Sequence, residues 1–358
     1  MSILVSFTFI VLIANLFSNV MKINQEVMTD TINQKLFYNT ILSQTFSPDG
    51  NYLLAGNIYG DISVFELSKA LGPHKVEENE LQGPNYHFTA HSNQQVESMI
   101  STDNFLVTGT SGEICGWDWK IITSSKNPKN KVSWTIQLPV NKDSYEKPDV
   151  NYLVYSKLNN LLYAGCGDNN IYIISLEDGR ILRSLEGHTD YIHCLSLMSN
   201  QLASCSEDGT VRLWDLRKKE NTNILTPHLI DKVARPRLGK WIGAIDFTDD
   251  WLLCGGGPNL SLWHMRTMEA ATVFDLPDEG IHVANIYEER VIAAGSAPHV
   301  YHLTYQGEML AKVPTSSNTV YSIIYQETPQ KVFSIAGSSN NLDICTNFNY
   351  RELILKFA

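Results

Sequence analysis

Motifs for catalysis and metal binding are missing from this chain of 358 residues. It has no glycine-rich loop ending in Lys-Ser or Lys-Thr, no zinc-binding helix motif and no nucleophile elbow. One glycine-rich run does occur, Gly255-Gly256-Gly257-Pro258, but it lacks the lysine of a phosphate-binding loop and falls where a hairpin turn is expected. We therefore expect a protein that is not an enzyme, with no catalytic residue, no cofactor and no metal site.

An excess of positive charge is also missing. The chain has 27 Lys and Arg side chains against 38 Asp and Glu side chains, which gives a formal net charge of −11. Binding to phosphates needs concentrated Lys and Arg, so the composition does not predict a nucleic-acid-binding protein. Only locally basic loops are compatible with a contact to RNA.

Cysteine is scarce and follows no metal-binding spacing. The six cysteines form no CxxC pair and no zinc-ligand pattern with the histidines. Each lies in an apolar run, where a free cysteine behaves as a small buried hydrophobic residue. We expect reduced thiols in the core and a reducing compartment. The six are Cys115, Cys166, Cys194, Cys205, Cys254 and Cys345.

Residues 185–216 show the clearest local pattern in the chain. Three short apolar runs, 191–197, 201–205 and 210–216, are separated by two polar turns. Runs of this length with Asn-rich and Asp-Gly turns predict strands joined in tight hairpins. The unit opens with Gly187-His188 and nearly closes with Trp214-Asp215. This pattern resembles one blade of a WD-repeat propeller.

The resemblance implies a buried hydrogen-bond chain formed by His188, Ser204, Asp208 and Trp214. A nucleophilic triad is the alternative use of His, Ser and Asp, and it needs a serine that solvent can reach. Ser204 is expected inside a strand, and Trp214 offers only its indole N–H as a donor. Because a buried polar chain with every member satisfied stiffens a fold, we interpret the four residues as structural.

The three-run pattern repeats along the chain. Seven positions align with Trp214, at intervals close to the 40–45 residues of a four-stranded blade with its loops. We therefore expect an all-β fold, a single seven-bladed WD-repeat β-propeller over residues 40–358. Residues 352–357 are expected to supply an outer strand to the last blade. The aligned positions are Phe65, Trp117, Ile174, Trp214, Trp263, Leu303 and Cys345.

The signature is complete only in the fourth unit. The second unit keeps His91, Thr108 and Trp117 but has Ser111 where aspartate is expected. The fifth unit keeps its tryptophan but has Gly257 at the aspartate position. The last two units lack all the residues of the expected hydrogen-bond chain. The hydrogen-bond chain is therefore expected in full in one blade only.

Two segments precede the predicted ring. Residues 1–23 include an almost uncharged apolar run, 3–21, whose length approaches a membrane span. It is also compatible with a signal-peptide core, although the first basic residue, Lys22, follows the run, and with translation starting downstream at Met21 or Met28. Residues 24–39 have apolar side chains at nearly helical spacing, which predicts a short N-terminal helix.

Longer connections are expected to carry function, since loops on a rigid scaffold usually do. Residues 68–85 are mixed in charge, 120–131 contain four lysines and no acid, and 217–240 contain seven basic residues against two acids. We predict partner docking at Arg235, Arg237, Lys240 and Trp241, because Trp and Arg are enriched among residues that dominate interfaces. The alternatives are a solvated loop and, for Trp241, packing at the start of a strand.

From about residue 37 onward, the chain resembles the THO complex subunit 6 family of WD-repeat proteins. The resemblance implies a nuclear subunit of the assembly that couples transcription to messenger-RNA export. Its expected partners are other THO complex subunits. RNA contact is expected to be at most indirect or through basic loops, and neither a small-molecule substrate nor membrane contact is expected. A membrane-anchored or secreted propeller with a different partner is the alternative. The carrying motifs are Phe46-Ser47-Pro48, Leu54-Ala55-Gly56-Asn57, Gly187-His188-Thr189-Asp190, Arg235-Pro236, Trp241-Ile242-Gly243, Cys254-Gly255-Gly256-Gly257-Pro258, Leu262-Trp263-His264, Thr346-Asn347 and Tyr350-Arg351.

Overall fold

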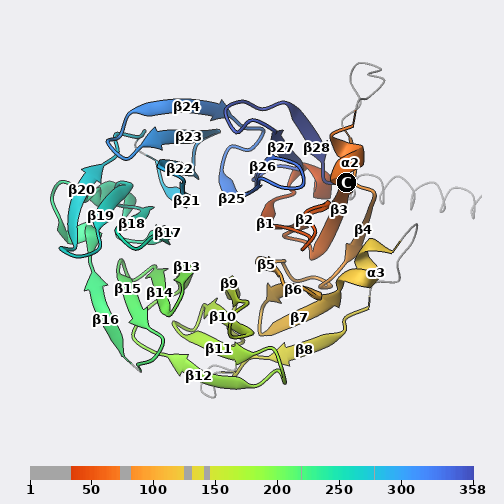
Figure 1. The fold of residues 1–358 in the computed structure, drawn as a ribbon, viewed down its shortest axis with the longest axis horizontal. Coiled ribbons are helices and arrows are strands. Elements are labelled where there is room, and N and C mark those ends of the chain that lie inside the picture. The colour runs from red at the N-terminus through yellow and green to blue at the C-terminus, as the bar shows by residue number, and fades with distance from the viewer. Residues whose placement is uncertain (1–33, 73–81, 125–130, 141–145, 219, 278) are drawn as a thin grey trace, which may run out of the picture. The chain divides into compact units, whose positions relative to one another are not determined.

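The computed structural model describes residues 34–72, 82–124, 131–140, 146–218, 220–277 and 279–358. The chain forms two compact units, Met1–Asn39 and Thr40–Ala358. In its described residues, the second unit contains seven four-stranded sheets with antiparallel pairing. Figure 1 shows these sheets arranged as blades around a central axis. The seven-bladed propeller that the repeats predict is thus confirmed.

Each blade is built from four strands that are consecutive in the chain, and the first of the four lies nearest the axis (Figure 1). Blades one to four contain β1 (Ile41–Phe46), β2 (Tyr52–Asn57), β3 (Asp61–Glu66) and β4 (Tyr86–Thr89); β5 (Ser98–Ser101), β6 (Phe105–Thr110), β7 (Glu113–Asp118) and β8 (Trp134–Gln137); β9 (Val150–Ser156), β10 (Leu161–Cys166), β11 (Ile171–Ser175) and β12 (Ile181–Leu185); and β13 (Ile192–Met198), β14 (Gln201–Ser206), β15 (Val211–Asp215) and β16 (Asn221–Leu225). Blades five to seven contain β17 (Ile242–Phe247), β18 (Trp251–Gly256), β19 (Ser261–His264) and β20 (Glu269–Val273); β21 (Ile281–Tyr287), β22 (Arg290–Gly295), β23 (His299–Thr304) and β24 (Met309–Pro314); and β25 (Val320–Gln326), β26 (Val332–Gly337), β27 (Asn341–Cys345) and β28 (Leu353–Lys356).

Helical structure in the described residues is short. The helices of the ring are α2 (Leu67–Ala70), α3 (Trp119–Thr123) and two 3-10 turns, η1 (Pro227–Leu229) and η2 (Pro236–Leu238). In the first unit, residues 34–37 are helical, while the apolar leader (1–23) and most of the predicted helix (24–39) lie outside the described residues. Within the described part of the chain, no helix has the length and apolar character needed to cross a membrane.

The seven residues aligned with Trp214 all occupy the same place in the third strand of their blades. Trp214 pairs with Leu202, and Phe65 pairs with Leu53, in both cases the second residue of the second strand. All seven side chains are at most 5% exposed. The sequence period therefore reflects one buried position that each blade must fill with a large or apolar side chain.

The hydrophobic core lies between neighbouring blades. Leu213 of blade four, for example, belongs to one buried cluster with Ile242 and Trp263 of blade five. Each blade is twisted and apolar on both faces, so it buries its area against the next blade around the ring. The fold is consequently held by a closed series of blade-to-blade contacts.

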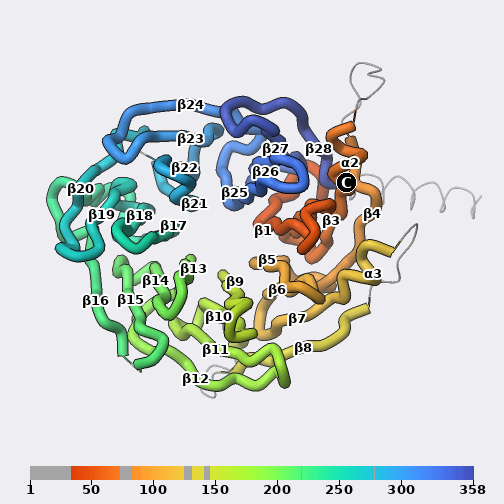
Figure 2. The backbone as a smooth tube through the Cα atoms, in the orientation of Figure 1, coloured from red at the N-terminus to blue at the C-terminus, as the bar shows by residue number. Residues whose placement is uncertain are grey.

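The ring closes between blades one and seven. The outer strand β28 pairs with β27, as predicted for residues 352–357, so the described residues of blade seven all come from the C-terminal end of the chain. Ser63 Oγ of β3 donates to the Phe357 carbonyl at 2.5 Å, and Phe357 is 1% exposed. Figure 2 shows the C-terminal segment beside the first blade. Burying one phenylalanine side chain contributes roughly 1.5–3 kcal/mol.

Two expectations about the connections need correction. Residues 217–240, predicted as an inserted basic loop, contain the outer strand β16 and the turns η1 and η2. Residues 68–85 and 120–131 include helical residues of α2 and α3. β16 was missed because its sequence, Asn-Thr-Asn-Ile-Leu, is mostly polar and mostly exposed at the rim. An outer strand that meets solvent carries no apolar run for a sequence pattern to detect.

Candidate functional site

Blade four holds four side chains in one hydrogen-bond chain. Trp214 Nε1 lies 2.8 Å from Ser204 Oγ, and Ser204 Oγ lies 2.8 Å from His188 Nε2. His188 Nδ1 in turn lies 2.8 Å from Asp208 Oδ2. His188 precedes β13, whereas Ser204 is on β14, Trp214 is on β15 and Asp208 is in the turn between those strands. The chain therefore ties the connection into blade four to its two central strands.

The donors along this chain follow from the chemistry of the indole. An indole N–H only donates, so Ser204 Oγ accepts from Trp214 and gives its own proton to His188 Nε2. Burial lowers the pKa of His188, which favours a neutral ring whose Nδ1–H donates to Asp208. Burial opposes ionisation of Asp208, but hydrogen bonds from His188 and Thr210 outweigh it and lower the pKa of this carboxyl.

The four side chains are buried, and Ser204 is fully inaccessible. A serine nucleophile needs an oxygen that a substrate carbon can approach, with the histidine free to accept its proton. Here the Ser204 oxygen already accepts from an indole N–H inside the blade. The arrangement holds a connection in place and presents no nucleophile to solvent.

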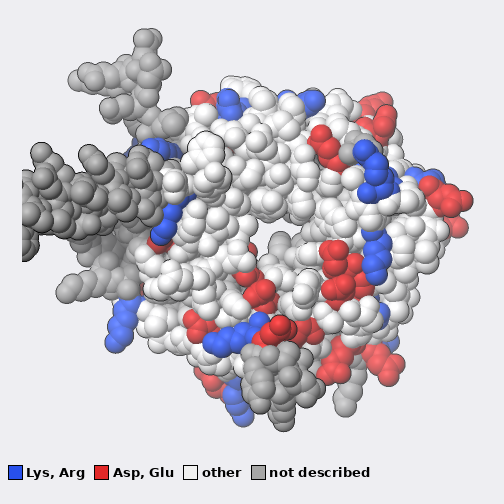
Figure 3. Space-filling model, turned by 180° about the vertical axis from the view of Figure 1, so that it is seen from behind, with Lys and Arg blue, Asp and Glu red and all other residues white. Residues whose placement is uncertain are grey.

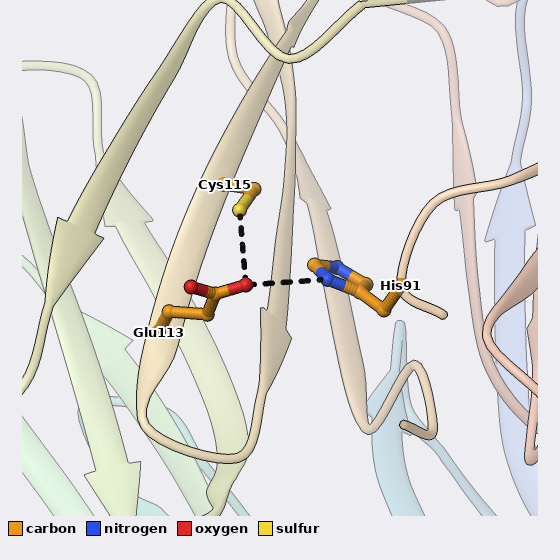
Figure 4. Close-up of side chains that lie close together, drawn as sticks. All are labelled: His91, Glu113 and Cys115. Atoms are coloured by element: carbon orange, nitrogen blue, oxygen red, sulfur yellow. Dashed lines mark hydrogen bonds and ion pairs between the residues drawn. The ribbon is translucent and has the colours of Figure 1, made fainter. Parts of the chain in front are cut away.

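Blade two has a looser version of the same chain. His91 Nε2 lies 2.9 Å from Thr108 Oγ1, which also accepts from Trp117 Nε1 at 3.0 Å. The nearest carboxylate to His91 Nδ1 is Glu113, at 3.8 Å, too far for a hydrogen bond. Figure 4 shows Glu113 between His91 and the thiol of Cys115. Sequence reasoning missed Glu113 because it looked for the acid at position 111, in the turn.

Other blades replace the chain with different polar contacts. In blade five, Trp263 Nε1 donates to Ser261 Oγ at 2.9 Å, since Cys254 stands where blade four has Ser204. In blade seven, Asp343 accepts from Ser316 at 2.6 Å and from Arg351 at 3.0 Å. Each of these networks satisfies a buried polar group, which would otherwise cost about 1–3 kcal/mol.

The predicted docking residue Arg235 contacts its own blade. Its guanidinium donates to the carbonyls of Gly256, Gly257 and Pro258 at 2.8–3.1 Å. The turn between β18 and β19 also comes close to Gly239, because a Cβ on Gly257 would lie 2.5 Å from the Gly239 carbonyl oxygen. Arg235 and the run Gly255-Gly256-Gly257-Pro258, which both carry the family resemblance, therefore form one structural unit at this turn.

Trp241 is half-buried and packs at the start of β17. Its indole N–H donates to the Leu238 carbonyl at 2.9 Å, and its ring stacks on His282 with centroids 5.2 Å apart. The other two predicted docking residues, Arg237 and Lys240, are exposed. The structure thus places two members of the predicted set on the surface and two in contacts within the ring.

A cavity of about 540 Å³ runs along the central axis, between the first strands of the blades. Glu97 and Asn285 line it, and Glu97 Oε2 and Asn285 Oδ1 have no hydrogen-bond partner among the described residues. Burial, with a contribution from Asp149, raises the pKa of Glu97 to about 7. Sequence reasoning did not find this group, because nothing in the pattern around residue 97 distinguishes a channel carboxylate from a surface one.

Acidic side chains gather on one face of the ring. Figure 3 shows carboxylates beside the central opening on that face. Four acidic residues and one basic residue line a single cleft of about 660 Å³: Glu146, Asp149, Asp168, Asp190 and Lys147. A concentration of negative charge repels phosphates, so this part of the surface does not suit an RNA backbone.

The six cysteines are free and buried, as the apolar runs predicted. Burial raises the pKa of five of them, to about 12 for Cys254 and Cys345 and about 11 for Cys115. A buried thiol with a raised pKa is a poor nucleophile. Five of the six thiols are therefore poor nucleophiles at neutral pH.

Comparison with known proteins agrees with the fold and identifies the family. The family model "WD domain, G-beta repeat" matches residues 179–215, which contain the first three strands of blade four and the strand β12 before them. The chain is 38% identical to THO complex subunit 6 homolog of Danio rerio over 327 residues, which cover 90% of this chain and 99% of that protein. It is 38% identical to THO complex subunit 6 of Drosophila melanogaster, covering 89% of each, and 39% identical to the Homo sapiens protein, covering 89% of this chain and 93% of the relative. At 38–39% identity over about nine-tenths of its length, the chain belongs to the THO complex subunit 6 family.

Proposed function

We propose that this protein is a non-catalytic scaffold subunit of a THO-like nuclear complex that couples transcription to messenger-RNA processing and export. The observation that carries the proposal is the family membership, at about 90% coverage, combined with a rigid ring. The one serine–histidine–aspartate set that the sequence singles out is buried and satisfied within a blade. A rigid ring with a large exposed rim suits the binding of other proteins.

The docking surface we propose lies at the entry to blade five. Arg237 and Lys240 are exposed there, and Trp241 next to them is held in place by its contacts with Leu238 and His282. Arg235 shapes this surface from within, because its guanidinium fixes the turn after β18. Exposed cations on a rigid support favour an acidic segment of a partner subunit, because Lys and Arg form charge-assisted hydrogen bonds with carboxylates.

We propose that contact with RNA is at most indirect. The overall charge is −11, and the carboxylates beside the central opening oppose binding of a phosphate backbone there. The basic side chains at the entry to blade five are the exception, and we propose that they bind an acidic segment of a partner protein. A membrane-anchored or secreted propeller is the alternative, and it rests on the apolar residues 3–21, outside the described part of the chain.

The test is purification of the tagged full chain from nuclei, followed by identification of the proteins that accompany it. We expect THO subunits with the wild-type chain and a loss of at least tenfold in their yield with the double variant Arg237→Glu, Lys240→Glu. Arg235 stays unchanged, because its loss would disturb the fold. The matched control reverses two exposed charges elsewhere, Lys120→Glu and Arg266→Glu, and should retain the subunits.

Each result decides one part of the proposal. Absence of THO subunits with the wild-type chain would contradict the proposed function. Full retention by the Arg237 and Lys240 variant, with an unchanged melting temperature, would remove this surface from the interface. Recovery of the chain in a membrane or secreted fraction would favour the alternative.

A further inference from the structure

We propose that His91, Glu113 and Cys115 of blade two bind a zinc ion. Each offers one ligand atom, and the three atoms lie within 4.8 Å of one another. His91 Nδ1 is 3.8 Å from Glu113 Oε1, and Cys115 Sγ is 3.9 Å from the same oxygen. In a tetrahedral zinc site the bonds are about 2.0–2.3 Å long, which sets ligand atoms roughly 3.3–3.8 Å apart. The two pairs that include Glu113 are close to this spacing, whereas the His91 and Cys115 ligand atoms, within 4.8 Å of one another, must approach by up to about 1 Å when the ion binds (Figure 4).

Comparison with blade four shows why blade two has room for an ion. In blade four, His188 Nδ1 lies 2.8 Å from Asp208, so the imidazole has a carboxylate within hydrogen-bond distance. Blade two has Ser111 at that position, and His91 Nδ1 instead faces Glu113 at 3.8 Å. Two charged or polar groups held slightly too far apart for a hydrogen bond are at a suitable distance to share a metal.

The residues around the trio hold it in the orientation that a metal requires. His91 Nε2 is engaged by Thr108 at 2.9 Å, which leaves Nδ1 facing the other two ligands. Gln137 donates to Glu113 Oε2 at 2.8 Å, and the other oxygen, Oε1, is the one that points toward Cys115. Metal-binding histidines and carboxylates are commonly held in this way by a second hydrogen bond.

The donor set and the burial point to zinc. A thiolate, an imidazole and a carboxylate are all zinc ligands, and the thiolate disfavours Mg²⁺ and Ca²⁺, which prefer oxygen. The side chain of His91 is 2% exposed and that of Glu113 is 28% exposed, so the site is mostly enclosed with one open side. On binding, the Cys115 thiol loses its proton to water and its sulfur forms the metal bond.

A bound ion would have a structural role. His91 lies in the connection between β4 and β5, and Glu113 and Cys115 lie on β7. The ion would therefore tie the connection that joins blades one and two to the third strand of blade two, as the aspartate does in blade four. Sequence spacing gave no sign of this site, because the histidine and the other two ligands are far apart in the chain.

Titration of the metal-free full chain with Co²⁺ tests the proposal, because a cobalt–thiolate bond gives a charge-transfer absorption band in the near ultraviolet. We expect the band to saturate at one Co²⁺ per chain and to disappear when Zn²⁺ displaces the cobalt. Cys115→Ser should abolish the band, and Glu113→Gln should weaken binding at least tenfold. Gln137→Ala should weaken it by about 10–100-fold through loss of the supporting hydrogen bond. Saturating Zn²⁺ should raise the Tm of the wild type by about 5 °C.

Controls separate this site from other thiols and from unfolding. Cys166→Ser removes a different buried thiol and should keep the band. Melting curves without metal show which variants are folded. If Glu113→Gln is unfolded, the test of the metal site rests on Cys115→Ser and Gln137→Ala. Absence of the band in the wild type would overturn the proposal and leave a loose His91–Glu113 ion pair beside a buried thiol. A band that survives in Cys115→Ser would overturn it equally, because the ion would then lie elsewhere.

Discussion

Replacing Trp214 with phenylalanine tests the interpretation of the blade-four chain. The substitution keeps a large aromatic ring in a position that is 1% exposed but removes the N–H that donates to Ser204 at 2.8 Å. Loss of one partner from a buried polar chain costs about 1–3 kcal/mol. Trp214→Ala removes the ring as well, and we expect it to cost about 3–5 kcal/mol.

Trp263 in blade five provides the matched control. Its ring is equally buried and its N–H donates to Ser261 at 2.9 Å, but no histidine or aspartate continues that chain. If the four-membered chain in blade four is cooperative, Trp214→Phe should cost about 1 kcal/mol more than Trp263→Phe. Both free energies of unfolding are measurable by urea denaturation at pH 7, with equal m-values as the check for two-state behaviour.

Two results would refute the reasoning. Equal costs for the two phenylalanine variants would show that the chain adds nothing beyond a single buried hydrogen bond. A Ser204→Ala variant that unfolds like the wild type, yet abolishes a hydrolytic activity, would show that the buried serine is catalytic after all. We expect that variant to cost about 1–3 kcal/mol and to have no effect on hydrolysis.

Three further predictions concern other parts of the chain. The pKa of Glu97 is raised from 4.5 to about 7, so the stability that its protonated form contributes is present below pH 4.5 and is lost as the pH rises through 7, by about 3 kcal/mol at most. Glu97→Gln should therefore raise the Tm at pH 8 more than at pH 5. An equal change in Tm at both pH values would contradict the raised pKa. Arg235→Met should cost about 2–4 kcal/mol, because the carbonyls of Gly256 and Gly257 lose a charged donor, and a melt identical to the wild type would show that the turn stands without it. A chain that starts at Met28 should fold and stay in solution without detergent, since every blade lies downstream; recovery of folding only when residues 1–27 are restored would contradict this expectation.

The architecture could be predicted because each blade repeats one strict requirement. Trp214 and its equivalents fill the same buried position opposite the second strand, so their spacing marks the third strand of every blade. The apolar runs around them mark two more strands. The outer strand could not be predicted in the same way, since β16 is polar and lies at the solvent-exposed rim.

The site residues were harder to predict, because their roles depend on neighbours that are distant in the sequence. The spacing of Gly-His and Trp-Asp pairs is shared by many blades, so His188 and Asp208 could be aligned with a known pattern. The contacts of Arg235 with its own blade could not be predicted, because its guanidinium donates to carbonyls more than twenty residues later in the chain. Glu113 was missed for a related reason: it approaches His91 only once the connection before β5 packs against β7.

Direct reconstitution tests whether this ring is a subunit of a THO-like complex, as we propose. The purified full chain is mixed with a complex of the other THO subunits, and the mixture is separated by size-exclusion chromatography with mass determination of each peak. The proposed function predicts that the chain migrates with the complex in a fixed ratio and that Arg237→Glu with Lys240→Glu releases it. Migration of the wild-type chain at its own mass, apart from the complex at micromolar concentrations, would contradict the claim.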